Sequence, residues 1–388
     1  MYDVNKIREE FPILSREVHG KPLIYLDNGA SAQKPQCVID AINLTYSNEY
    51  SNVHRGLHFL SNLATEKYES VREKIRSFLG AEFQDEILLN SGTTEGINTI
   101  SYGWAAPRLK AGDEIILSVM EHHANIVPWH FLRERQGVVL KWAEPNKAGE
   151  LNPDDILNLI TPKTKLIAIT HMSNVLGTVV DVKKICEAVK NDEIAVLVDG
   201  SQSAVHLPID VKDLGCDFFA ITGHKLYGPS GSGAIYIKRE RLNEMQPFMG
   251  GGDMIKEVQK DFVSYNVSPH KFEAGTPSIV EAIGLGVAID YLTSIGMQNI
   301  YAHEVNLKNY AEEKLNKLEA WNEESIDHAL KEAQTSLSLP TPKLNQPIRI
   351  AMTGSTQSPS LGLTLSLFDS VEVNKRIDAA LKYLANSN

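Results

Sequence analysis

Cysteine is scarce in this sequence of 388 residues, which contains only Cys37, Cys186 and Cys216. Three cysteines are too few for a disulfide framework, and none has the spacing to a second cysteine that a metal site would need. Each cysteine is therefore expected to be a reduced thiol.

Basic residues are also in deficit, because 38 Lys and Arg stand against 49 Asp and Glu, for a formal net charge of -11. This balance argues against non-specific nucleic-acid binding, which needs a basic surface to displace phosphate counterions. The opening stretch MYDVNKIREEFPIL mixes charged with apolar residues, so it resembles neither a secretory signal nor a membrane span. We expect a cytoplasmic protein that acts on small molecules and has no membrane partner.

Apolar residues are plentiful at 43%, enough for a large core, and the length favours two domains. Short β-branched runs predict buried strands, and most are separated by segments with helical periodicity. In one such segment Val182, Ile185, Cys186 and Val189 fall on a single helical face. The alternation predicts an α/β fold with a mostly parallel, doubly wound sheet. The strand-like runs begin at Glu86, Asp113, Thr164, Ile194 and Cys216.

Unusual polar residues gather where two of these strands end. VLVDGSQS places Asp199 and Gln202 after one strand, and FAITGHK places Thr222, His224 and Lys225 after another. Ligands of doubly wound sheets bind outside the carboxyl ends of the strands. A carboxylate and an amine at neighbouring strand ends could equally form a simple ion pair.

The stretch LNSGTTEGIN reads as a strand, a tight glycine turn and the start of a helix. Amides and hydroxyls at Thr93 and Thr94 would offer an anion site at the positive end of that helix. An ordinary N-cap would explain one threonine, but not the run Gly-Thr-Thr.

Together, an anion site, a lysine and a carboxylate at separate strand ends meet the needs of pyridoxal phosphate. A lysine such as Lys225 forms a Schiff base with the cofactor aldehyde, and Asp199 would keep the pyridine nitrogen protonated. The lysine must be partly desolvated to lose its proton near neutral pH, which suits its setting among Gly, Pro and bulky residues.

The motifs EHHANIVPWH, SNVLGT, DGSQS, GHKLYGP and FEAGTPS resemble, in order and spacing, cysteine desulfurases of the SUF type. These are fold type I pyridoxal-phosphate enzymes, and their relatives include selenocysteine lyases. The resemblance covers about residues 1–310, and it implies pyridoxal 5'-phosphate as the cofactor and a homodimer as the assembly.

The resemblance also assigns roles to single residues. Lys225 becomes the Schiff-base lysine, His122 stacks on the ring, and both are catalytic. Gln202 donates to the ring oxygen, and Thr276 reaches the phosphate of the other subunit. Near the substrate it places Asn174, His54 and Arg55. The complete expected cofactor site is Thr93, Thr94, His122, Asp199, Gln202, Thr222, His224, Lys225 and Thr276.

Two parts of the family pattern are not visible in this sequence. A desulfurase needs a thiolate that takes the substrate sulfur, and the family supplies it from a C-terminal RxGHHC-like segment. The three cysteines precede a helix, sit inside one or open a strand, so packing roles are expected for all of them. The arginine that clamps the substrate carboxylate is missing too, since only Arg349 and Arg376 follow Arg241.

The composition changes after about Tyr310, where a helical stretch from Ala311 to Gln334 leads into a Pro- and Ser-rich linker. Residues from Leu315 to Leu381 look like the C-terminal end of bacterial glutamyl-tRNA synthetases. The HIGH and KMSKS signatures are absent, which excludes aminoacylation. We therefore expect a desulfurase-like body over 1–310 and, over 311–388, an atypical helical tail in place of the usual small domain.

Three functions follow from these observations. The first is a cysteine desulfurase that converts L-cysteine to L-alanine and passes sulfur to a SUF-type acceptor for iron-sulfur cluster assembly, impaired by the missing thiol. The second is activity on L-selenocysteine alone, and the third is a non-catalytic cofactor-binding or RNA-binding fusion. The near balance of charge in the tail makes RNA binding the least favoured.

Overall fold

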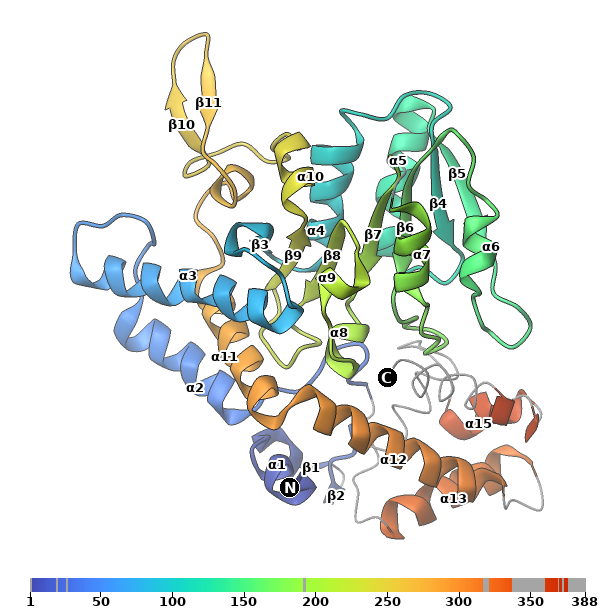
Figure 1. Cartoon of the computed structure of the whole chain (residues 1–388). Helices are drawn as coiled ribbons and strands as arrows, with labels where there is room; N and C mark the ends of the chain where they lie inside the picture. Colours follow the sequence, from blue (N-terminus) through green and yellow to red (C-terminus); the bar gives the residue numbers. More distant parts are fainter. Residues whose placement is uncertain are drawn as a thin grey trace.

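A computed structural model describes residues 2–18, 20–25, 27–190, 193–316, 321–336, 360–368, 370–371 and 373–375 (Figure 1). Its centre is a seven-stranded sheet in the order β3-β9-β8-β7-β6-β4-β5. The five strands from β8 to β5 are parallel, whereas β9 runs antiparallel to both β8 and β3. The predicted α/β class with a mostly parallel sheet is confirmed. The strands are β3 (Ile87–Asn90), β4 (Glu114–Ser118), β5 (Val139–Ala143), β6 (Thr164–Thr170), β7 (Ala195–Asp199), β8 (Phe218–Thr222) and β9 (Gly233–Ile237).

The five runs that the sequence marked as strands all lie in this sheet, as β3, β4, β6, β7 and β8. The expectation missed β5 and β9. Strand β5 is an edge strand with a half-exposed side-chain pattern, so it lacks the continuous apolar run of a central strand. Strand β9 is fully buried, but it follows directly on a Gly- and Ser-rich turn that reads as a loop.

Helices cover both faces of the sheet and bury two separate apolar clusters. One cluster packs α3 (Phe59–Leu79), α7 (Val182–Val189) and α11 (Ile279–Ile295) against the sheet. The other packs α4 (Thr93–Ile100), α5 (Val127–Gln136) and α10 (Arg239–Glu244) against the opposite side. All four residues expected on the buried face of α7 are buried, including Cys186.

Shorter elements complete the body. Its small helices are α1 (Val4–Glu9), α2 (Gln36–Leu44), α6 (Pro153–Leu157), α8 (Ser203–His206) and α9 (Val211–Leu214). A small hairpin joins β1 (Glu17–Val18) to β2 (Lys21–Pro22), and a second one, β10 (Ile255–Val258) with β11 (Val263–Tyr265), projects from the molecule (Figure 1). Among the described helices, none alone has the length and apolar character to cross a membrane; α11 and α12 (Met297–Asn316) meet that test only as a pair that bends by 69°.

The C-terminal part forms its own small cluster. Helix α12 (Met297–Asn316) runs without a break past residue 310 and leads to α13 (Glu323–Ser336) and α15 (Leu361–Ser366) (Figure 1). Leu315, Ile326, Leu330 and Leu365 are buried together there. The single helical stretch expected from Ala311 to Gln334 is wrong in detail, because residues 321–322 lie outside helix. Most of the proposed linker, with Arg349 and Arg376, lies outside the described residues.

Candidate active site

A cavity of about 390 Å³ opens where β6, β7 and β8 end and α4 begins. Of the residues singled out in the sequence, nine line this cavity, although they come from five separate segments of the chain. Parallel strands end at one edge of the sheet, which explains why polar residues following different strands meet there. The nine are Thr93, Thr94, His122, Asn174, Asp199, Gln202, Thr222, His224 and Lys225.

The carboxylate of Asp199 is held in one orientation by a short hydrogen-bond chain. Its Oδ1 accepts from the backbone N–H of Ser201 at 2.9 Å and from the Ser201 hydroxyl at 2.6 Å. The same Ser201 hydroxyl lies 2.7 Å from the Thr93 hydroxyl at the start of α4. All three side chains are buried. These hydrogen bonds connect the Asp199 carboxylate to the start of α4, and they use one of its two oxygens.

Lys225 carries the amine of this cavity, three residues after the end of β8. Burial lowers its pKa from the ordinary value of a lysine, and the charge of Asp199 opposes that lowering. A lysine with a lowered pKa is more often unprotonated, which is the form that acts as a nucleophile or a base. The simple ion-pair alternative is not what the structure shows, since no salt bridge joins Lys225 to Asp199 among the described residues.

Two imidazoles border the same amine. Burial lowers the pKa of His122, with Lys225 adding to the effect, and its Nδ1 accepts from the backbone N–H of Ala124 at 3.1 Å. Burial and the neighbouring lysines lower the pKa of His224 to about 4. Both rings are therefore neutral near pH 7. A neutral His122 can stack on an aromatic ring without placing a second positive charge beside Lys225.

The start of α4 forms an anion cradle. Gly92 has φ of 139°, a region that residues with a Cβ rarely adopt, and an added Cβ would lie 3.1 Å from the Thr222 hydroxyl. The backbone can thus approach a ligand closely, and the free N–H groups of the first helical turn face it. Glu95 accepts from both the N–H and the hydroxyl of Ser91, which closes the turn on its outer side. An anion cradle, a carboxylate and an amine facing one cavity match the donor set that pyridoxal phosphate needs, so the residues fit this group.

The remaining three predicted residues lie outside this cavity. His54 and Thr276 line a neighbouring cavity of about 200 Å³, and of the residues described there only Ser91 and Glu95 also line the first one. Arg55 is exposed and is among the lining residues of neither cavity. Within one chain, therefore, Thr276 does not share the cavity of Lys225.

Three further residues at the site were missed by the sequence reasoning. Ser201 could have been predicted from the motif DGSQS, because a hydroxyl two residues after a carboxylate at a strand end can donate a hydrogen bond to that carboxylate. Lys34 donates to the carbonyl of His224 at 3.2 Å, and burial lowers its pKa to about 8. Glu121 is buried beside His122, and burial raises its pKa to about 8. Nothing in the local sequence reveals the burial of Lys34 or Glu121.

The cysteines differ from one another. Cys186 and Cys216 are buried, as expected, and burial raises the pKa of both thiols, that of Cys186 to about 12. The packing role expected for Cys37 is wrong, because it lies inside the first turn of α2 and is exposed. None of the three lines the cavity of Lys225.

The comparisons with known proteins agree with this constellation. The family model described as Aminotransferase class-V matches residues 24–341. Enzymes of this class use pyridoxal phosphate, so the chain belongs to a class of pyridoxal-phosphate-dependent enzymes.

Curated relatives narrow the class. A probable cysteine desulfurase of Xylella fastidiosa (strain 9a5c) is 50% identical over 317 residues, which cover 82% of this chain and 76% of that protein. A cysteine desulfurase of Escherichia coli O7:K1 is 48% identical over 311 residues, or 80% of this chain and 77% of the relative. The crystal structure of the cysteine desulfurase CsdA from Escherichia coli superposes with a TM-score of 0.76 at 31% identity, over 99% of both chains. This chain is a member of the cysteine desulfurase family.

Proposed function

We propose that this protein is a cysteine desulfurase of the SUF type that acts on L-cysteine with pyridoxal 5'-phosphate bound in the cavity of Lys225. The observation that carries the proposal is the meeting of Lys225, Asp199 and the Thr93 helix start around one cavity. Lys225 would attach the cofactor covalently, Asp199 would face its ring nitrogen, and the α4 cradle would hold its phosphate. The other proposed contacts are Thr94, His122, Gln202, Thr222 and His224, with Thr276 supplied by a second subunit.

When bound, the cofactor supplies an electron sink that stabilises negative charge at the substrate Cα. The residues of the chain supply the remaining functions. Lys225, with its lowered pKa, is suited to hold and move the Cα proton through Nζ. Ser201 fixes Asp199, so this carboxylate presents its free oxygen in a constant direction. Asn174 lies on the wall of the same cavity, where its amide can orient the substrate.

Release of alanine also requires that the C–S bond breaks and that a thiolate accepts the sulfur as a persulfide. Cys186 and Cys216 are buried thiols with raised pKa values, and Cys37 lies on the surface of α2. None of these cysteines borders the proposed site. We therefore propose that substrate binding outlasts turnover and that sulfur transfer is impaired in this chain.

The test combines a spectrum with a product assay. The purified protein should be yellow because Lys225 holds the cofactor, and the Lys225→Ala variant should lack that lysine-bound absorbance. Titration with L-cysteine should change the spectrum with little alanine or sulfide released. Identical spectra for the parent and the variant would refute the assignment of Lys225. Rapid alanine release that disappears with Cys37→Ser would refute the proposed impairment.

Activity on L-selenocysteine is a second candidate, favoured by the absence of a cysteine among the residues that line the cavity of Lys225. Selenium leaves carbon more easily than sulfur does, so its release depends less on an enzyme thiol. Alanine formed from L-selenocysteine but not from L-cysteine would support this candidate, and equal rates on both substrates would contradict it. A non-catalytic fusion would bind cofactor and leave both substrates unchanged.

The remaining proposals concern the setting of the enzyme. We propose a homodimer in the cytoplasm, a SUF-type protein as sulfur acceptor, and a division into a 1–310 body and a 311–388 tail resembling a glutamyl-tRNA synthetase fragment. The family match ends at residue 341, and α12 crosses residue 310. A pull-down of the acceptor with the dimeric protein and with a monomeric variant would test whether acceptor binding needs the site formed between two subunits.

A further inference from the structure

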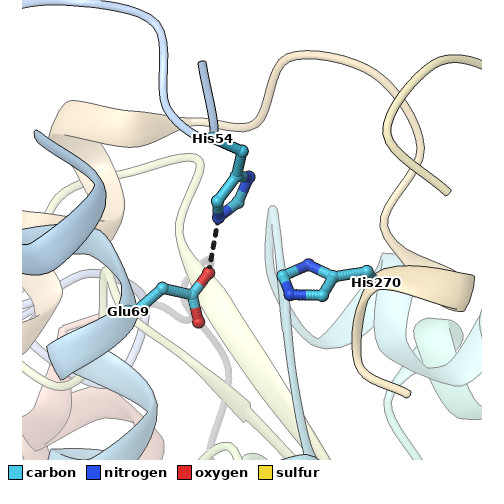
Figure 2. A group of neighbouring side chains, drawn as sticks. All are labelled: His54, Glu69 and His270. Carbon is cyan, nitrogen blue, oxygen red and sulfur yellow. Dashed lines mark hydrogen bonds and ion pairs between the residues drawn. The ribbon is translucent and has the colours of Figure 1, made fainter. Parts of the chain in front are cut away.

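Three side chains outside the cavity of Lys225 point toward one another. His54 precedes α3, Glu69 lies on α3, and His270 comes from the short helix 270–272 more than 200 residues later (Figure 2). The His54 Nε2 lies 2.8 Å from the Glu69 Oε1, and one ligand atom from each of the three residues lies within 4.8 Å of the others. The two imidazole rings meet edge to face with their centroids 5.0 Å apart.

The carboxylate of Glu69 is oriented by a buried ion-pair network on the side away from the two histidines. Arg72 donates through Nε to the second oxygen of Glu69 at 2.7 Å, while its two terminal nitrogens pair with Glu273 at 2.6 and 2.5 Å. Arg72 is only 2% exposed. The charge of Arg72 is thus matched by Glu273, and the Arg72, Glu69 and Glu273 group retains one negative charge. Outer partners of this kind orient a ligating carboxylate without neutralising it.

His54 is also fixed in place. Its backbone N–H donates to the Thr65 hydroxyl at 2.8 Å, and its φ of 57° is unusual for a residue with a Cβ. Such a conformation persists only where its surroundings enforce it, often at a functional position. Both His54 and His270 line the neighbouring cavity of about 200 Å³, so the space beside the cluster can admit water or another small ligand.

We propose that His54, Glu69 and His270 bind a divalent transition-metal ion, with zinc as the reference ion and one coordination position open to the neighbouring cavity. Two imidazoles and a carboxylate are a ligand set that suits zinc and its first-row neighbours. Tetrahedral zinc at about 2.0–2.1 Å from each ligand keeps ligand atoms about 3.3 Å apart. The His54–Glu69 pair would open by about half an ångström, and His270 would swing inward, which are side-chain adjustments.

A metal ion at this cluster would have a structural effect. It would connect α3 to the segment 270–272, and this segment lies a few residues before Thr276. The ion would therefore limit the motion of the segment that lines the neighbouring cavity. Within one chain none of the three ligands lines the cavity of Lys225, so metal binding can be measured separately from the proposed desulfurase chemistry.

The experiment uses the full-length holoprotein, dialysed against a chelator and then titrated with zinc or cobalt. We expect about one tightly bound ion per chain, and a cobalt spectrum without thiolate charge-transfer bands. His54→Gln and His270→Gln should each weaken binding at least tenfold, because loss of an outer partner of a ligand alone already costs about 10–100-fold in metal affinity. Glu66→Gln, on the exposed face of the same helix, and His328→Gln, an exposed histidine in α13, serve as matched controls and should bind like the parent.

Circular dichroism and the cofactor absorbance establish that each variant is folded, so a loss of metal is not confused with unfolding. Zinc should also raise the thermal midpoint of the parent but not that of His270→Gln. The proposal is overturned if the parent binds no ion, if both histidine variants bind as tightly as the parent, or if cobalt shows thiolate bands. Metal stoichiometry needs no turnover, so failure of the desulfurase proposal would leave this test intact.

Discussion

Single residues at this site are tuned mainly by burial. The amine of Lys225 and the imidazoles of His122 and His224 all have lowered pKa values because the cavity wall desolvates their charged forms. The carboxyl of Glu121 moves in the opposite direction, because desolvation penalises its anion and the nearby Asp199 adds repulsion. Burial thus favours the neutral form of each of these four groups.

The raised pKa of Glu121 predicts how stability depends on pH. In the folded protein its pKa is about 8, against an ordinary 4.5, so the native state holds a proton that the unfolded chain has lost between these values. Its contribution to stability is full below about pH 4.5 and is lost as the pH rises through about 8. Glu121→Gln stays neutral and keeps a similar shape. From pH 5.5 to 8 the parent should therefore lose a few kcal/mol more than this variant in urea unfolding. Parallel pH curves for both proteins would contradict this account of Glu121.

At the scale of elements, the start of α4 and the strands beside it depend on close backbone approach. Gly92 lies between β3 and α4 with its φ of 139°, and the Thr222 hydroxyl at the end of β8 sits beside the position of its missing Cβ. The helix start, the strand end and the Asp199–Ser201–Thr93 chain are thereby joined into one wall of the cavity.

Gly92→Ala should weaken cofactor binding. The change should cost about 1–3 kcal/mol in backbone strain and push the Thr222 side chain away from the cradle. Gly112→Ala is the matched control, since Gly112 also has a positive φ, 86°, but no atom lies within 4 Å of its missing Cβ. Absorbance titration with pyridoxal phosphate should give a dissociation constant at least tenfold higher for Gly92→Ala, while Gly112→Ala loses stability only. Equal affinities in the two variants would show that Gly92 has no part in the cradle.

At the scale of the whole molecule, two cavities lie next to each other and share few residues. The Lys225 cavity holds most of the proposed cofactor contacts, whereas Thr276 and His54 line its neighbour. If Thr276 completes the cofactor site as proposed, it cannot do so within its own chain and a second copy of the chain is required.

We predict a homodimer with shared sites. Light scattering should give about twice the chain mass of 43.0 kDa. Because Thr276 would act on the partner's site, Thr276→Val should weaken cofactor binding in its own homodimer. Mixing it with Lys225→Ala should restore one intact site per heterodimer, visible as recovered absorbance at limiting cofactor. A monomer that binds the cofactor normally would refute the shared site, and so would a mixture with no recovery.

The sequence by itself determined the features that depend on local pattern. Apolar runs and helical periodicity identified five of the seven sheet strands and the buried face of α7, because burial repeats with the period of each element. The Gly-Thr-Thr turn and the residues after β7 and β8 could be placed at one edge, since parallel strands end together.

Other features were decided only by the tertiary structure, because they depend on which surfaces of the chain pack together. The half-exposed edge strand β5, the burial of Glu121 and the exposure of Cys37 depend on which distant parts of the chain pack against each of them. The meeting of His54 and Glu69 with His270 has no local signal, because it needs α3 and the segment 270–272 to pack side by side. Periodicity records which face of an element is apolar, but the neighbour of that face is chosen by the folding of the entire chain.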